Sequence, residues 1–155
     1  KENKTEAKEK YEEDKEILAK VEENKVTCTF VAPSNPDGTK GTATYELFYN
    51  EEDMLESYTM TLTIDPLEGN AMGLTSTQAV YNAYKAVDAA QIVGYKMTTS
   101  YTDTGMKAIS IVDLTKLDKS TFPTGYTGYA AVPFNLNDLK TANVQYLTST
   151  NYICQ

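Results

Sequence analysis

The segment Leu74-Thr-Ser-Thr-Gln-Ala-Val-Tyr81 decides how the rest of this chain is arranged, because its pattern is typical of the start of an amphipathic helix. Thr75 and Gln78 form a capping-box pattern, in which each side chain satisfies a backbone N–H at the beginning of a helix. Apolar residues then recur at helical spacing at Val80, Tyr84 and Val87. The pattern predicts a helix over residues 75–90, and its single apolar stripe indicates that the helix lies on a sheet.

The hydrophobic period changes from that of a helix to that of a strand after Gly94, which is placed to take the left-handed conformation that ends many helices. Apolar and polar residues alternate from Tyr95 to Tyr101, which predicts a strand with one buried face. Thr102-Asp-Thr-Gly105 is a turn sequence, and the β-branched segment from Met106 to Val112 is expected to pair back as a hairpin.

Three further strands are expected before the helix, because apolar residues alternate with polar ones in three short segments. These segments are Val26–Ala32, Ala43–Tyr49 and Tyr58–Ile64. Turn-rich sequences separate them at Pro33–Gly41 and Asn50–Asp53. We therefore expect successive strands to be antiparallel.

The chain after the second hairpin carries a weaker pattern. Asn135 is expected to cap a short helix with Leu136 and Leu139 facing inward, and the segment from Val144 is expected to be irregular until a final strand at Tyr152–Cys154. The sequence thus predicts an α+β fold. Its single antiparallel sheet of about five or six strands has one main amphipathic helix packed on one face, in the order β-β-β-α-β-β-(α)-β.

Composition and charge exclude several classes of function. The 155 residues, 41% of them apolar, suffice for one domain with a core, and no apolar run approaches the ~18 residues of a membrane span. The net charge of −8 argues against nucleic-acid binding, which needs clustered cations. The sequence contains no Arg, His or Trp, so the commonest general base and metal ligand are both absent. We therefore predict no cofactor, no metal and no enzymatic activity.

Residues 1–25 differ from the rest of the chain, with seven Lys, nine acidic residues and only Ile17, Leu18 and Val21 as large aliphatic side chains. We expect a charged N-terminal arm or tether here and a single globular domain over residues 26–155. An ordinary charged helix that caps the domain is the alternative. Because the chain starts at Lys1 and not at Met, we also expect that an upstream segment was removed.

Three segments of this layout are similar to those of a known family: Thr75-Ser-Thr-Gln-Ala-Val80, Gly94-Tyr-Lys-Met-Thr-Thr-Ser-Tyr101 and Ile109-Ser-Ile-Val-Asp-Leu-Thr-Lys-Leu-Asp118. They resemble the YehR-like small bacterial lipoproteins, and the resemblance covers residues 26–142. It implies attachment to the membrane through a lipidated cysteine upstream of this chain. The family has no established biochemical role, so the resemblance implies no site residue.

Carboxylates are the first candidates for chemistry. Four of them gather in or near one turn: Glu51, Glu52, Asp53 and Glu56. Carboxylates in a turn stay solvated, so we interpret these as surface residues. A hydrolase with a carboxylate pair would instead need distant residues such as Asp65 and Asp113 in one cleft.

Tyr126 and Tyr129 are the candidate ligand-binding residues. They lie in a Gly-rich loop where no core periodicity requires them, and exposed aromatic rings on loops are typical of binding surfaces. The alternative is that each ring packs onto its own domain.

The chain has two cysteines, Cys28 in the first expected strand and Cys154 in the last. Neither has a His to activate it or a metal-ligand companion at short spacing, and paired cysteines are typical of exported proteins. We therefore predict a Cys28–Cys154 disulfide and an extracytoplasmic location.

These features predict a non-enzymatic lipoprotein domain of the cell envelope that binds an unknown ligand or protein partner. It is expected outside the membrane of a bacterium, and the Lys-only set of cations suggests a low-GC Gram-positive one. No nucleic-acid partner is expected, and membrane contact is expected only through the upstream anchor. The alternatives are an extracellular hydrolase with a carboxylate pair and a structural or adhesion component of the envelope.

Overall fold

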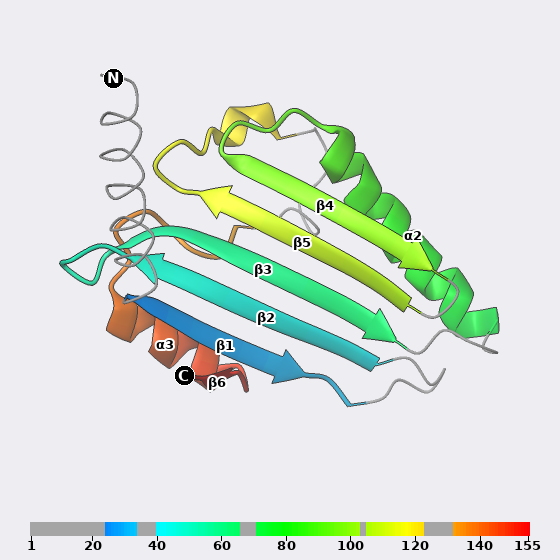
Figure 1. The fold of residues 1–155 in the computed structure, drawn as a ribbon, viewed down its shortest axis with the longest axis horizontal. Coiled ribbons are helices and arrows are strands. Elements are labelled where there is room, and N and C mark those ends of the chain that lie inside the picture. The colour runs from blue at the N-terminus through cyan, green and yellow to red at the C-terminus, as the bar shows by residue number, and fades with distance from the viewer. Residues whose placement is uncertain (1–23, 34–39, 66–70, 103–104, 123–131) are drawn as a thin grey trace, which may run out of the picture.

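Alternating side chains build one antiparallel sheet with its helices on one side. The computed structural model describes residues 24–33, 40–65, 71–102, 105–122 and 132–155. The sheet has six strands in the order β4-β5-β3-β2-β1-β6. Their bounds are β1 Lys25–Val31, β2 Lys40–Tyr49, β3 Leu55–Asp65, β4 Tyr95–Thr102, β5 Gly105–Asp113 and β6 Ile153–Cys154. The helices are α2 Ala71–Ala89, the 3-10 helix η1 Lys119–Thr121 and α3 Lys140–Ser149 (Figure 1). The predicted α+β class, strand number and element order are confirmed.

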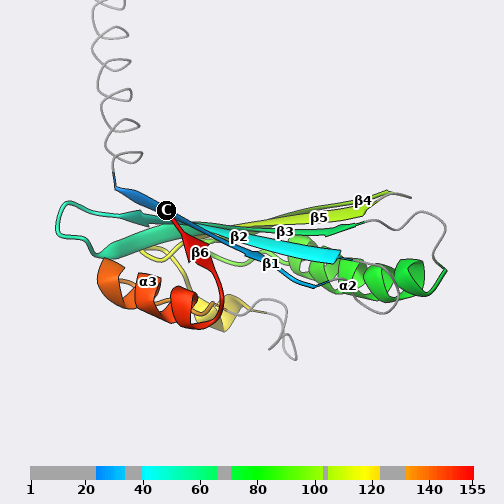
Figure 2. The same cartoon turned by 90° about the horizontal axis from the view of Figure 1, so that it is seen from below.

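Both long helices lie on the same face of the sheet (Figure 2). Helix α2 packs against β4 and β5 at one end, and α3 adjoins β6 at the other. No described helix or strand covers the opposite face, on which threonines from β1, β2 and β3 are register partners: Thr29, Thr44 and Thr61. The sheet therefore has one packed face and one polar face, which is common for antiparallel sheets.

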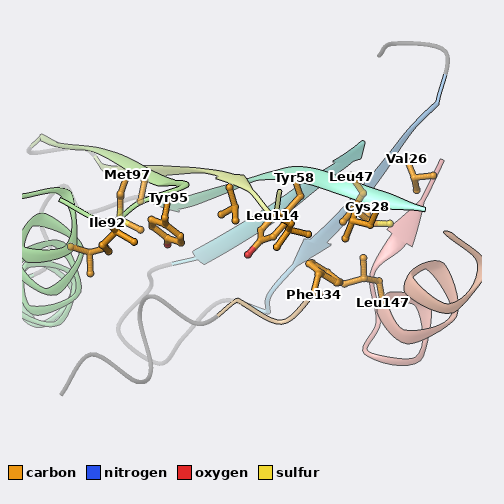
Figure 3. Close-up of a cluster of buried hydrophobic side chains, with 14 of the residues drawn as sticks. Val26, Cys28, Leu47, Tyr58, Ile92, Tyr95, Met97, Leu114, Phe134 and Leu147 are labelled. Atoms are coloured by element: carbon orange, nitrogen blue, oxygen red, sulfur yellow. The ribbon is translucent and has the colours of Figure 1, made fainter. Parts of the chain in front are cut away.

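The packed face carries the hydrophobic core (Figure 3). Each of the five long strands contributes buried side chains at alternate positions, among them Cys28, Leu47, Tyr58, Met97, Met106 and Val112. Helix α2 adds Tyr84 and Val87, while Phe134 and Leu147 come from the C-terminal part of the chain. The alternation of apolar and polar residues predicted from the sequence for β1, β2, β3 and β4 thus corresponds to alternating inward and outward side chains in the folded strands.

Aromatic rings fill the region below the middle of the sheet. The ring centroids of Tyr45 and Tyr58 each lie close to Phe134, at 5.3 and 5.1 Å, with edge-to-face geometry. Tyr152 joins this cluster 5.6 Å from Tyr45. Burial raises the pKa of the Tyr45 and Tyr58 hydroxyls far above the ordinary value of 10.0.

The main helix begins earlier than the sequence pattern predicts. Because α2 spans Ala71–Ala89, Thr75 lies inside the helix, and the predicted cap at that residue is wrong. The residues just before Thr75 include Ala, Met and Leu, which are strong helix formers. They extend the helix backwards across one glycine at a cost of about 1 kcal/mol. The predicted inward face is confirmed at Tyr84 and Val87, which are buried.

Gly94 has the expected positive φ, 77°, but it forms the turn into β4 and does not end the helix, which stops at Ala89. Its carbonyl accepts a hydrogen bond from the Asp113 N–H at 2.8 Å. A Cβ atom at this position would lie 2.5 Å from the backbone nitrogen of Leu117. Glycine is therefore required here for both conformation and space.

Helix α3 lies later in the chain than predicted. Leu136 and Leu139, expected to face inward, are 44% and 54% exposed. Asn135 does not cap a helix, because α3 begins at Lys140 with Leu139 at its N-cap. The Asn135 N–H instead donates to the Asp138 carboxylate at 2.9 Å within a turn. The helix instead occupies Lys140–Ser149, most of which was expected to be irregular.

A buried polar contact helps to hold α3 in place. The Asn143 side chain is 5% exposed and donates to the Tyr49 hydroxyl at 3.1 Å. Leu147, one turn further along, is the buried aliphatic residue of this helix. Because only one aliphatic side chain of α3 is fully buried, its sequence has no clear helical hydrophobic period.

The substitution Gly94→Ala is expected to lower the free energy of unfolding by about 2 kcal/mol or more, since alanine disfavours positive φ and its Cβ meets backbone. Gly41→Ala is the control, because a Cβ there has no atom within 4 Å, and its effect should stay within about 1 kcal/mol. Urea unfolding of both variants measures the difference. Equal losses of unfolding free energy in the two variants would show that glycine is not specifically required at position 94.

Alkaline pH should unfold the protein before Tyr45 and Tyr58 ionise in the folded state. Burial raises the pKa of both hydroxyls, while in the unfolded chain they ionise near 10.0. Their contribution to stability is therefore complete below about pH 10 and is lost as the pH rises further. Phenolate absorbance should then show a step that coincides with loss of circular dichroism. If all twelve tyrosines ionise before the protein unfolds, this prediction is wrong.

Candidate functional site

Two of the sequence-derived candidates lie outside the described residues. Tyr126 and Tyr129 fall within residues 123–131, and nearly all of the charged arm falls within residues 1–23. Their assignments as a ligand-binding loop and a tether stay predictions.

Cys28 and Cys154 form the predicted disulfide, which joins β1 to β6. The two residues are direct register partners, and their Cα atoms lie 4.0 Å apart. Beside them, Thr27 and Gln155 exchange two backbone hydrogen bonds of 3.0 and 2.8 Å. In an antiparallel ladder the next pair is then a non-hydrogen-bonded one, in which side chains approach most closely. The disulfide therefore lies at a non-hydrogen-bonded pair, where the two cysteine side chains are close enough to bond.

A surface groove of about 630 Å³ lies at this edge of the sheet. Its polar lining consists of Thr27, Thr29, Asn151 and Gln155. Its apolar lining consists of Phe30, Val31, Pro33 and Ile153. None of these residues is charged, although the chain carries a net charge of −8. The groove therefore suits an uncharged or mainly apolar ligand.

The disulfide lies directly beside the groove. The residues directly before and after each cysteine line the groove: Thr27, Thr29, Ile153 and Gln155. Strand β6 has only two residues, and so short a segment frays unless it is tied down. The bridge thus holds one wall of the groove in place.

The edge of β1 continues beyond β6. The pairing with β6 covers Cys28 and Thr29, whereas β1 extends to Val31. The Ala32 N–H donates to the Gly41 carbonyl on the β2 side at 2.9 Å. Because hydrogen-bonding direction alternates along a strand, the N–H and C=O of Val31 point away from β2, toward the groove edge.

The carboxylate pair considered for a hydrolase is not brought together. Asp113 pairs with Ser57 near one end of β3, and Asp65 is the residue at the other end. The eight residue steps from Ser57 to Asp65 correspond to about 26 Å at ~3.3 Å per residue. Among the residues that the structure describes, no three His, Cys, Asp or Glu side chains are grouped to hold a metal ion.

The acidic turn between β2 and β3 is solvated, as expected, but part of it is also structural. The Asp53 carboxylate lies 3.1 Å from the Asn24 amide nitrogen and 3.7 Å from the Lys140 Nζ. The Lys140 Nζ also donates to the Asn24 Oδ1 at 2.8 Å. This polar cluster joins the start of β1, the turn and the start of α3. Asn24 and Lys140 are 116 residues apart, and no sequence pattern links them.

The fold defines the class of this protein as a one-sheet α+β domain, and comparison with known proteins adds one structural likeness. No family model matches the chain, and no curated protein matches it. A solved NMR structure of a protein from Streptococcus pneumoniae TIGR4 is similar, with a TM-score of 0.50 and 17% sequence identity over 85% of this chain and 86% of that chain. At this identity the likeness concerns the fold alone. In the described part of the chain, no helix is long and apolar enough to cross a membrane.

The protein, denatured without reductant, should contain no free thiol. Replacing both cysteines with alanine opens a link between positions separated by 126 residues, and we expect a loss of about 2 to 5 kcal/mol in unfolding free energy. Thiol titration and urea unfolding measure the two effects. Reduction of the unaltered protein is the control, since it should reproduce most of the loss without changing side-chain volume. Two free thiols per chain in protein made in an oxidising compartment would refute the bridge.

Proposed function

We propose that this chain is the folded domain of a non-enzymatic, membrane-anchored protein of the bacterial cell envelope, and that it binds a ligand or protein partner in the groove that residues of β1 and β6 line. The supporting observation is the shared position of the groove and the Cys28–Cys154 disulfide. Since the bridge holds one wall of the groove, the site depends on the oxidised protein. Structural disulfides persist outside the reducing cytosol, which supports an extracytoplasmic location.

The size and chemistry of the groove support a binding role. Its volume of about 630 Å³ falls within the roughly 300–1,000 Å³ range of ligand sites. Apolar side chains supply contact area, and the amide and hydroxyl groups of Asn151, Gln155 and Thr29 supply hydrogen bonds that fix orientation. These uncharged groups are suited to recognition and offer no general base of ordinary strength.

Attachment through a lipidated cysteine upstream of Lys1 is part of the proposal. It is supported by the resemblance to YehR-like lipoproteins and by the charged composition of residues 1–25. The arm leads directly into β1, which begins at Lys25 and forms one side of the groove. The use of Lys as the only cationic residue type supports a low-GC Gram-positive source.

A structural or adhesion role is the second candidate, because one observation favours it. No described element covers the face of the sheet opposite the helices (Figure 2). Threonines of β1, β2 and β3 are cross-strand partners on this face. A flat polar face of this kind suits a broad contact with a surface. The hydrolase alternative has less support, because Asp65 is the last residue of β3, whereas Asp113 in β5 pairs with Ser57 near the other end of β3.

A photo-crosslinking amino acid at position 153 tests the proposal in cells that make the full-length protein. Irradiation is expected to give a discrete adduct, because Ile153 lines the groove and is 73% exposed. The matched control places the same amino acid at Val93, which is 49% exposed and precedes β4 at the other edge of the sheet. Membrane fractionation and thiol alkylation of the same cells report anchoring and oxidation. Identical adducts at both positions, or a soluble protein with free thiols, would count against the proposal.

A further inference from the structure

We infer that the groove takes an extended polypeptide, which adds as a short strand to the edge of β1 where β6 ends. The inference rests on the proposed binding function and specifies the class of ligand. Strand addition uses unpaired backbone groups of a sheet edge for affinity and pockets for alternate side chains for specificity. Figure 1 shows that β1 runs past β6 at the outer edge of the sheet. Val31 lies on this part of β1 and lines the groove.

Hydrogen-bond direction along β1 fixes where the ligand backbone fits. Thr27 faces β6, because it exchanges two backbone hydrogen bonds with Gln155. Every second residue of a strand faces the same side, so Thr29 and Val31 also direct their backbone groups to this edge. Thr29 has Ile153 as its partner in β6. The register of β6 ends there, and Val31 has no strand partner on this side within the described residues.

The surrounding side chains favour a peptide with apolar residues at alternate positions. Val31 and Ile153 are 52% and 73% exposed, so a ligand gains apolar contact by covering both. Phe30 lies on the other side of β1, where its ring contacts Tyr152 at 5.5 Å. The described lining residues include no cation for a phosphate or carboxylate, whereas the Asn151 amide can pair with a peptide backbone.

In the described part of β1, the open edge also lacks the charges that commonly protect free strands. Sheet edges are often blocked by lysine, proline or a bulge. In β1 the charged residue is Lys25 at the opposite end of the strand, and Pro33 limits the open edge after Val31. At the other edge of the sheet, β4 carries an exposed Lys96 within the strand. The unprotected segment is therefore short and confined to the groove.

The test uses random linear peptides of about eight residues, displayed on phage and selected on the oxidised full chain. The best peptide is synthesised with a fluorophore, and its affinity is measured by fluorescence polarisation. Val31→Pro removes the outward N–H and leaves the β1–β2 hydrogen bonds, so it should weaken binding about three- to tenfold. Val31→Ser should also weaken binding, whereas its matched control Val93→Ser should not. Circular dichroism verifies that each variant is folded.

Backbone N-methylation of the peptide gives a test that leaves the protein unaltered. A strand ligand should lose affinity when alternate residues are methylated and keep it when the intervening residues are methylated. Equal effects at all positions, no selected peptide, or binding of an uncharged oligosaccharide in place of peptides would overturn the inference. If the crosslink at position 153 still forms in those cases, the groove stays a binding site and only the peptide assignment fails. If neither peptide binding nor the crosslink at position 153 is observed, the proposed function is wrong as well.

Discussion

The structure depends on burial of one face of a wide six-stranded sheet, which the described helices cover only in part. Helices α2 and α3 lie near opposite ends of the sheet, so they do not cover its middle (Figure 2). Large aromatic side chains complete the cover: Tyr45 and Tyr58 project from β2 and β3 against Phe134. Rings provide more buried area per residue than aliphatic side chains, and they pack well edge to face. Two other strand tyrosines also have polar partners for their hydroxyls, Asn143 for Tyr49 and Ser110 for Tyr95.

Sequence reasoning succeeded where a single physical rule decides the structure. Strands covered on one face must alternate, and the alternation in β1, β2, β3 and β4 was visible in the sequence. Strand β5 was predicted from its β-branched residues and the turn before it. It failed where two rules compete. Thr75 has the chemistry of a cap, but the good helix formers before it extend the helix. In α3 a buried Asn143 replaces an apolar residue, and its partner Tyr49 lies 94 positions away, so periodicity alone misses the helix.

The candidate site was only partly accessible from sequence. The even number of cysteines, neither of which has a metal-ligand companion, indicated the disulfide. The disulfide in turn indicates that β6 lies beside β1. The groove itself depends on the turn that brings Asn151 and Ile153 to Val31, and on where β6 stops. Val31, Asn151 and Ile153 carry no signature, because residues that line an uncharged groove look like ordinary surface residues. The exposure of Ile153, 73%, is seen only in the folded structure.

The disulfide also determines how the domain bears mechanical load. The two cysteines are separated by 126 residues, so nearly all of the sheet lies within one covalent loop. Tension applied across the bridge, between a point before Cys28 and a point after Cys154, runs through the sulfur atoms and not through the ladder of hydrogen bonds. Only the short segments outside the loop can then lengthen. A molecule held to a cell at one side of the bridge and pulled at the other would keep its sheet, its aromatic core and most of its edge intact while the tension lasts.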